Sequence, residues 1–106
     1  MDTTTSAALT AFVAAAQSII DAHFAAHLKN LTADKLTVEP GRKYAKIVRS
    51  YSTGGGRSVF CFVDMTNGNV LKAETWKKPA KHARGNIFTP DNGASAVTEY
   101  GAHYMR

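Results

Sequence analysis

The sequence RSVFCFVDMTNGNVLKAET, residues 57–75, is the stretch that decides the fold. Apolar and β-branched residues crowd the segments 57–65 and 70–75, which is typical of β-strands. The first segment is apolar on both faces at its middle, and this predicts a central strand. Asn67-Gly68, between the two segments, is the strongest short hairpin signal. The stretch therefore predicts two antiparallel strands joined by a tight turn.

The sheet is expected to extend toward the N-terminus. Residues 42–51 predict a further strand, with Tyr44, Lys46 and Val48 on one face and Ala45 and Ile47 on the other. Neither face is cleanly apolar, which favours an edge strand or a ligand-facing strand. Residues 36–39 can add a fourth strand. The loop 52–56 is rich in glycine and predicts a flexible hairpin; as a phosphate cradle it lacks the Walker spacing and leads into a strand.

Residues 5–30 predict a long amphipathic helix. Thr4, Thr5 or Ser6 can cap its start, and Asn30 can end it. An alanine-rich side permits close approach of a second helix, although alanine is also the best helix former. The apolar positions recur with spacings of three and four: Leu9, Phe12, Val13, Ala16, Ile19, Ile20, Phe24, Leu28 and Leu31.

Together these elements predict one α+β domain spanning residues 1–106. The helix packs across an antiparallel meander of three or four strands. After Trp76 the pattern becomes irregular, and we expect a basic C-terminal arm in which Pro79 opens a short helical turn through Ala83. We also expect a homo-oligomer, assembled through the alanine-rich helix side or an exposed strand edge.

Charge is spread unevenly along the chain. The net charge is +5, but residues 1–40 carry −2 and residues 41–106 carry +7. A partner that binds through charge is therefore expected to meet the second part of the chain. The single Cys61 excludes an intramolecular disulfide framework and fits a reducing cytoplasm. We find no signal peptide pattern and no apolar run of the length that spans a bilayer, so no membrane partner is expected.

The segment Lys72–Phe88 combines cations, the only Trp and a single acid, Glu74. Cations beside an aromatic plane suit a ligand that has phosphates and a base. The plain alternative is a structural arm with solvated lysines. The predicted ligand-binding residues include two arginines from the sheet: Trp76, Lys72, Lys77, Lys78, Lys81, His82, Arg84, Asn86, Arg49 and Arg57.

The sequence gives less support for a catalytic site or a metal site. His23 and His27 lie four residues apart, a spacing that can hold zinc, but no further ligand motif accompanies them. We interpret them as partly buried or interface histidines. Cys61 lies between two phenylalanines, where an apolar setting dulls a thiol. The acids are scattered singly. We therefore predict no catalytic residues, no metal and no cofactor, with a phosphodiesterase using His82 as the enzymatic alternative.

The stretch SVFCFVDMTNGNVLKAETWKKPAKHARGNIF, residues 58–88, resembles a group of small proteins encoded by bacteriophages. The likeness covers about residues 43–106 and carries over no site residues. It implies a phage protein that works in the cytoplasm of an infected bacterial host. Small phage proteins of this kind include nucleic-acid binders and proteins that sequester nucleotide signals of bacterial defence.

The leading expectation is a non-enzymatic protein that binds and sequesters a phosphate-bearing nucleotide signal. The first alternative is a single-stranded nucleic-acid-binding protein, which would show affinity that falls steeply with salt. The phosphodiesterase is the second alternative. A virion or assembly protein without a ligand is also compatible with the sequence.

Overall fold

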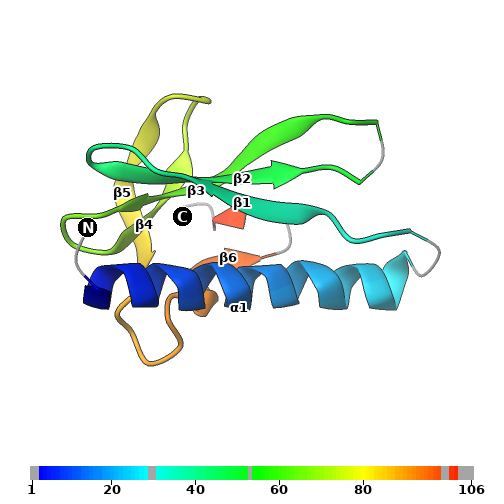
Figure 1. Cartoon of the computed structure of the whole chain (residues 1–106), viewed down its shortest axis with the longest axis horizontal. Helices are drawn as coiled ribbons and strands as arrows, with labels where there is room; N and C mark the ends of the chain where they lie inside the picture. The colour runs from blue at the N-terminus through cyan, green and yellow to red at the C-terminus, as the bar shows by residue number, and fades with distance from the viewer. Residues whose placement is uncertain (1–2, 29–30, 53, 99–100, 103–106) are drawn as a thin grey trace.

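The computed structural model describes residues 3–28, 31–52, 54–98 and 101–102. The helix α1 (Thr3–His27) lies along one face of a five-stranded antiparallel sheet (Figure 1). The strands follow one another in the order β1-β2-β3-β4-β5, so the sheet is a meander. The α+β prediction is confirmed, with more strands than the three or four expected.

The strands match the predicted segments closely in the middle of the chain. A short 3₁₀ helix, η1 (Ala94–Ala96), and a small second sheet follow the meander. The strands of the main sheet are β1 (Lys35–Glu39), β2 (Tyr44–Ser50), β3 (Arg57–Asp64), β4 (Asn69–Ala73) and β5 (Pro79–Asn86), and those of the second sheet are β6 (Val97–Thr98) and β7 (Gly101–Ala102).

The predicted irregular arm with its helical turn is wrong, because residues 79–86 form β5. Pro79 is the first residue of this strand, and β5 is an edge strand, the two settings in which a sheet tolerates proline. A Cβ atom at Gly85 would lie 2.6 Å from the Cβ of Ala96, so this glycine permits close packing of η1. In the sequence, Pro79 and Gly85 look like turn residues, and this is why an irregular arm was predicted.

The helix α1 begins at Thr3, so Thr4, Thr5 and Ser6 lie inside it, and their predicted capping role is wrong. The expected stop at Asn30 lies outside the described residues. The core side chains on α1 recur at the predicted spacing: Leu9, Phe12, Ala16, Ile20 and Phe24. Phe12 and Ile20 are fully buried, and each such side chain stabilises the fold by about 1.5–3 kcal/mol.

A β-bulge changes the expected alternation of β3. The pairing of β2 with β3 shifts between Ile47 and Val48, which leaves Phe60 as the extra residue. Phe60 and its neighbour Cys61 consequently both belong to the core that includes α1. The Asn67-Gly68 turn forms as predicted, with the Gly68 N–H donating to the Asp64 carbonyl (2.7 Å) and a φ of +81° at Gly68.

By length and composition alone, α1 could also cross a membrane, contrary to the expectation that no segment would. Core helices pass the same test. Phe12, Ala16 and Ile20 are completely buried in a core shared with the sheet. We therefore interpret α1 as a core helix.

Candidate anion-binding site

The sheet has a second apolar centre, on the face away from α1. Val48, Phe62 and Leu71 are buried but lie outside the core that includes α1. The register pairs Lys46 with Phe62, and Phe62 with Leu71, so Lys46, Phe62 and Leu71 lie on one face of the sheet. Apolar neighbours along the same strands belong to the α1 core and so point the other way: Ile47, Cys61, Val63 and Val70. We call this second surface the outer face.

The β4–β5 hairpin rises from the sheet on the side away from α1 (Figure 1). Its tip is closed by the Lys78 carbonyl, which accepts from the N–H groups of Glu74 and Thr75, both at 3.0 Å. Trp76 lies in this tip, with Lys46 Nζ 4.3 Å and Arg57 Cζ 5.5 Å from its ring centroid. Both cations come from strands of the sheet, so the hairpin tip is held against the sheet by cation–π contacts.

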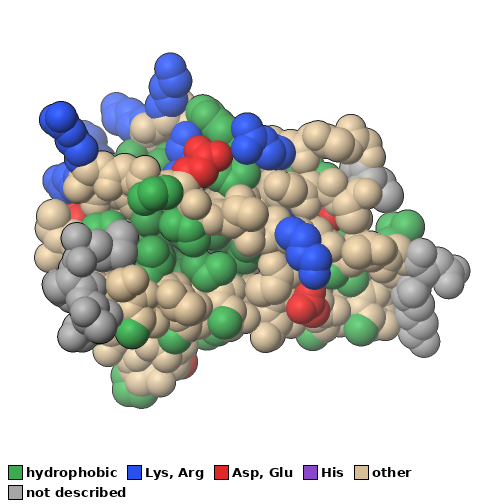
Figure 2. Space-filling view, viewed as in Figure 1, with side chains coloured by type: hydrophobic (Ala, Val, Ile, Leu, Met, Phe, Trp, Pro, Cys, Tyr) green, Lys and Arg blue, Asp and Glu red, His purple; other side chains and the backbone are tan. Residues whose placement is uncertain are grey.

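Beside this contact, two adjoining hollows of about 290 and 560 Å³ open on the outer face. They share Lys43, Tyr44 and Lys77, and we call them together the basic groove. Two acids, Glu39 and Asp64, also line it. In Figure 2 most of the Lys and Arg side chains in view crowd at the upper left, over the sheet. The basic groove contains six cations: Arg42, Lys43, Lys46, Lys77, Lys78 and Lys81.

The two acids of the basic groove already have partners. Glu39 Oε2 lies 3.3 Å from Nη1 of Arg57, the same arginine that contacts the Trp76 ring. Asp64 Oδ1 accepts from both the N–H (2.9 Å) and the hydroxyl (2.6 Å) of Thr66, which fixes the β3–β4 turn. Lys78 has a looser, exposed pair with Glu74 at 3.9 Å. Thr66 is neutral, so Asp64 keeps its negative charge, and six cations against two acids leave the basic groove with a net positive charge.

An aromatic pair lies at the middle of the basic groove. The rings of Tyr44 and Phe62 meet edge to face, with centroids 6.2 Å apart. Lys43 Nζ lies 5.4 Å from the Tyr44 ring centroid. Tyr44 is half-buried, while Phe62 is buried beneath it in the outer face. An aromatic ring flanked by cations in this way can stack a base while the cations meet its phosphates.

The structure brings three of the predicted residues, Lys77, Lys78 and Lys81, into the basic groove. The sequence analysis missed Lys43, Lys46 and Tyr44 as site residues. Their signal was present, because neither face of the strand 42–51 was cleanly apolar and the strand was interpreted as ligand-facing or as an edge. The strand is not an edge, since β2 lies between β1 and β3.

A third hollow of about 540 Å³ lies along the β4–β5 hairpin. It collects two further predicted residues, Lys72 and His82, together with Lys78 and Lys81, which also line the basic groove. Because Lys72 alternates with Leu71 along β4, its side chain leaves the strand on the opposite side from the outer face. The hairpin therefore carries cations on both sides.

Three predicted residues have partners within the fold. The Asn86 side chain donates to the Asn67 carbonyl (2.8 Å) and to Asn69 Oδ1 (3.0 Å), and it accepts from the Phe88 N–H (2.8 Å). Arg84 donates to the His82 carbonyl. Arg49 alternates with Val48 along β2, so its side chain leaves the strand on the face away from the outer face, where it pairs with Asp34. These contacts indicate structural roles for the three side chains.

Arg49 forms the most buried ion pair of the described chain, with its Nε 2.8 Å from Asp34 Oδ2. The second carboxylate oxygen of Asp34 accepts from the Ser52 N–H at 2.8 Å. Burial by itself would raise the pKa of Asp34, but the Ser52 hydrogen bond and the Arg49 guanidinium outweigh it, and the pKa lies below its ordinary value. The pair ties the start of β1 to the end of β2.

Other sequence features stay apart from the basic groove. The glycine loop joins β2 to β3 at the end of β2 away from Tyr44, with positive φ at Gly54 and Gly55. The rings of His23 and His27 lie 5.0 Å apart on α1. Among the described residues, no three His, Cys, Asp or Glu side chains are grouped to hold a metal. Cys61 is fully buried, and this burial raises the pKa of its thiol.

The model of a family of unknown function, DUF7717, matches residues 3–104 of the chain. No curated protein matches the chain. No solved structure matches it either.

Proposed function

The chain belongs to this family of unknown function, and from its structure we propose that it binds single-stranded nucleic acid along the basic groove. One observation carries the proposal: six Lys and Arg side chains surround an aromatic pair, and the two acids among them have partners. A binder of this kind needs cations for the phosphates and an aromatic platform for the bases.

The shape of the basic groove supports a polymer more than a single small molecule. Its two hollows adjoin at Tyr44, and both open to solvent on the outer face. Sites for small ligands commonly enclose most of the ligand surface. An open trough lets a chain enter at one end, near Arg42, and leave at the other, near Lys81.

The side of the molecule that α1 covers offers little that competes for phosphates. The helix α1 contains no Lys or Arg and a single acid, Asp21. Phosphates are therefore drawn to the sheet side, and the cations of the basic groove would fix the register of the strand. Because several contacts are ionic, the affinity should fall with salt, with a slope of about −0.7 for each phosphate neutralised.

Sequestration of a phosphate-bearing nucleotide remains a second candidate, favoured by the third hollow. Its volume of about 540 Å³ suits one nucleotide, and Lys72, Lys78, Lys81 and His82 line it. The likeness to phage proteins would make such an activity a defence against host signalling. This candidate needs a discrete ligand with fixed stoichiometry instead of a track for a chain.

The proposal is tested by fluorescence anisotropy with labelled oligothymidylate of about 12 nucleotides at about 50 and 200 mM salt. We expect binding that weakens as salt rises. The double variant Lys43→Ala/Lys77→Ala removes the two cations shared by both hollows and should weaken binding at least about 10-fold. The matched control is Ser18→Glu/Ala25→Glu, which makes the same net charge change on the exposed side of α1.

Equal losses in the double variant and the control would mean that overall charge, and not the basic groove, drives binding. Absence of binding at the lower salt would overturn the proposal. Saturable binding of single nucleotides, lost in Lys72→Ala/His82→Ala and independent of chain length, would replace it with sequestration. Shortened oligonucleotide products would replace it with the phosphodiesterase.

A further inference from the structure

The two edges of the sheet differ in how well they are protected. The edge strand β5 starts at Pro79 and has two register shifts against β4. Proline and bulges both discourage pairing with another chain. The opposite edge strand, β1, keeps an unbroken register with β2 over all five of its residues. β1 is therefore the better template for an added strand.

The contacts of Gln17 show which groups of β1 face outward. Its side-chain amide accepts from the Leu36 N–H (2.9 Å) and donates to the Asp34 carbonyl (2.8 Å). Because Leu36 points its N–H away from β2, the alternation of an antiparallel ladder turns the N–H and carbonyl of Val38 outward as well. Gln17 thus covers the edge of β1 at Asp34 and Leu36, while the N–H and carbonyl of Val38 point away from the sheet.

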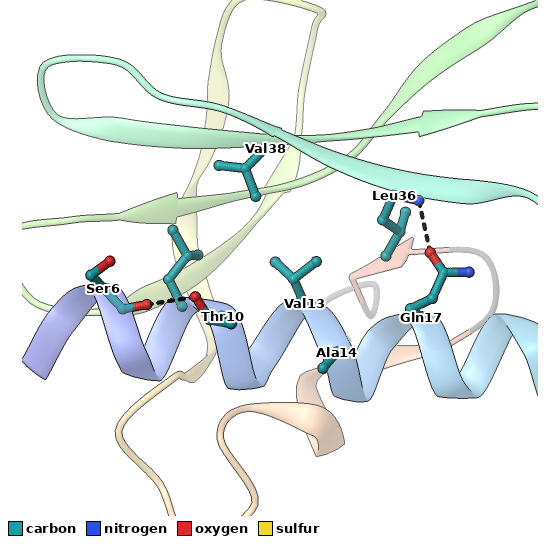
Figure 3. A pocket seen from close by; sticks show the side chains of 8 residues that line it. Ser6, Thr10, Val13, Ala14, Gln17, Leu36 and Val38 are labelled. Atoms are coloured by element: carbon teal, nitrogen blue, oxygen red, sulfur yellow. Dashed lines mark hydrogen bonds between the residues drawn. The ribbon is translucent and has the colours of Figure 1, made fainter.

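An apolar groove of about 520 Å³ runs beside this edge, between β1 and α1. Figure 3 shows Val13 pointing from α1 toward β1, with Leu36 and Val38 pointing from β1 toward the helix. Val38 is 38% exposed, unusual for a valine beside a core. The groove has room for apolar side chains of an added strand, which would lie on the same face as Leu36 and Val38.

We propose that a second copy of the chain pairs with β1 in antiparallel orientation, about a two-fold axis at Thr37. The strand reads Lys35-Leu36-Thr37-Val38-Glu39, so Lys35 faces the partner's Glu39, and the reverse pair forms at the other end. Leu36 faces the partner's Val38, which supplies apolar groups to the groove of each copy. The charges of this strand complement one another only in the antiparallel orientation.

The backbone supports the same register. The Val38 N–H of each copy donates to the Leu36 carbonyl of the other, and each Leu36 N–H donates to the partner's Val38 carbonyl, so the Gln17 amide leaves the Leu36 N–H when the dimer forms. A two-fold contact uses both β1 edges and closes, whereas pairing β1 with β5 would continue into a filament. The dimer joins two five-stranded sheets edge to edge, so the two outer faces, with their basic grooves, lie on one side.

The charge pairs are tested by sedimentation velocity over about 1–200 µM protein at low salt. The wild-type chain should dimerise. Lys35→Glu turns both pairs into like charges and should weaken the dimer by about 10- to 30-fold. Lys35→Glu/Glu39→Lys restores opposite charges between the copies and should return the affinity to within about 3-fold, because the Glu39–Arg57 pair that it breaks within each copy is exposed and contributes little. Ser18→Glu/Ala25→Glu, which makes the same net charge change as Lys35→Glu, should have no effect.

The axis is tested by Thr37→Cys under oxidising conditions. The two exposed Thr37 residues would face each other as a non-hydrogen-bonded pair, with Cα atoms about 4.5 Å apart, which a disulfide can bridge. Covalent dimer should form far faster than in the exposed control Ser95→Cys, and the buried Cys61 should not react. Equal cross-linking of the two variants, a wild-type monomer at the highest concentration, or equal dimerisation of Lys35→Glu and the charge-swapped double variant would each overturn the proposal.

Discussion

The two faces of the sheet are made by the same strands but differ in nearly every physical respect. The face under α1 contributes Ala45, Ile47 and Val63 to a continuous core with the helix. The outer face has a small apolar centre that ends in the basic groove and its cations. Along β2, Ala45 and Ile47 therefore pack under α1, whereas their neighbours Tyr44 and Lys46 line the basic groove.

This difference separates stability from binding. Side chains under α1 should set the free energy of unfolding, and side chains of the basic groove should set ligand affinity with little effect on unfolding. Substitutions on the two faces test this division directly, because a variant that changed both properties equally would contradict it.

The largest effect is expected on the face under α1. Phe12→Ala removes a fully buried ring and should lower the free energy of unfolding by about 3–5 kcal/mol. The measurement is guanidinium denaturation followed by circular dichroism. The control is Ala25→Ser on the exposed side of α1, which should lower the free energy of unfolding by less than about 0.5 kcal/mol. Thr66→Ala would not serve as a control, because the Thr66 hydroxyl donates to Asp64.

The Asp34–Arg49 pair should make stability depend on pH. Because the folded pKa of Asp34 lies below its ordinary value of 3.8, the pair stabilises the fold above that pH. The stabilisation is lost as the pH falls through the folded pKa. Asp34→Asn should lower the free energy of unfolding by about 2 kcal/mol at neutral pH. Denaturation at a series of pH values should show a smaller acid-induced loss in the variant, and an unchanged loss would contradict this account.

Tyr44 tests the other half of the comparison, the effect of the basic groove on ligand affinity. Tyr44→Leu keeps an apolar side chain but removes the stacking ring, so affinity for oligothymidylate should fall about 10-fold. The control is Tyr51→Leu, an exposed tyrosine at the other end of β2, which should bind as the wild type does. Anisotropy titrations of both variants decide the matter, and a similar loss in each would remove Tyr44 from the site.

Trp76 links the hairpin to the outer face and should give the smallest effect. Trp76→Ala removes two cation–π contacts of a partly exposed ring and should cost about 1 kcal/mol of folding free energy. Trp76→Phe should recover part of this loss. Thermal unfolding followed by circular dichroism measures both, and a cost above about 3 kcal/mol would mean that Trp76 belongs to a core.

Much of the fold was predictable because it rests on local signals. The spacing of Leu9, Phe12 and Ile20 predicted the helix and its buried side, and Asn67-Gly68 predicted the β3–β4 hairpin. The fifth strand was not predictable in the same way. Pro79 and Gly85 are ordinary turn residues in sequence, and only pairing with β4 and the close approach of Ala96 give them a place in a strand.

The candidate site was predictable in part for a similar reason. Lys77, Lys78 and Lys81 stand out because they are close together in the sequence. Lys46 comes from β2 and Lys43 from the residue just before it, more than 25 residues away, and both join the three lysines only through the register of the sheet. Arg49 was predicted as a ligand-binding residue, although its alternation along β2 had already placed it on the face away from Lys46.

The sequence by itself determined the helix, the central hairpin and the positive charge of the second half, since each depends on neighbours within a few residues. Only the tertiary structure decided which cations share a surface, that Trp76 lies against Lys46 and Arg57, and that β1 is left as the regular edge. These follow from contacts between residues far apart in the chain, whose geometry is set by strand register and packing and not by local propensity.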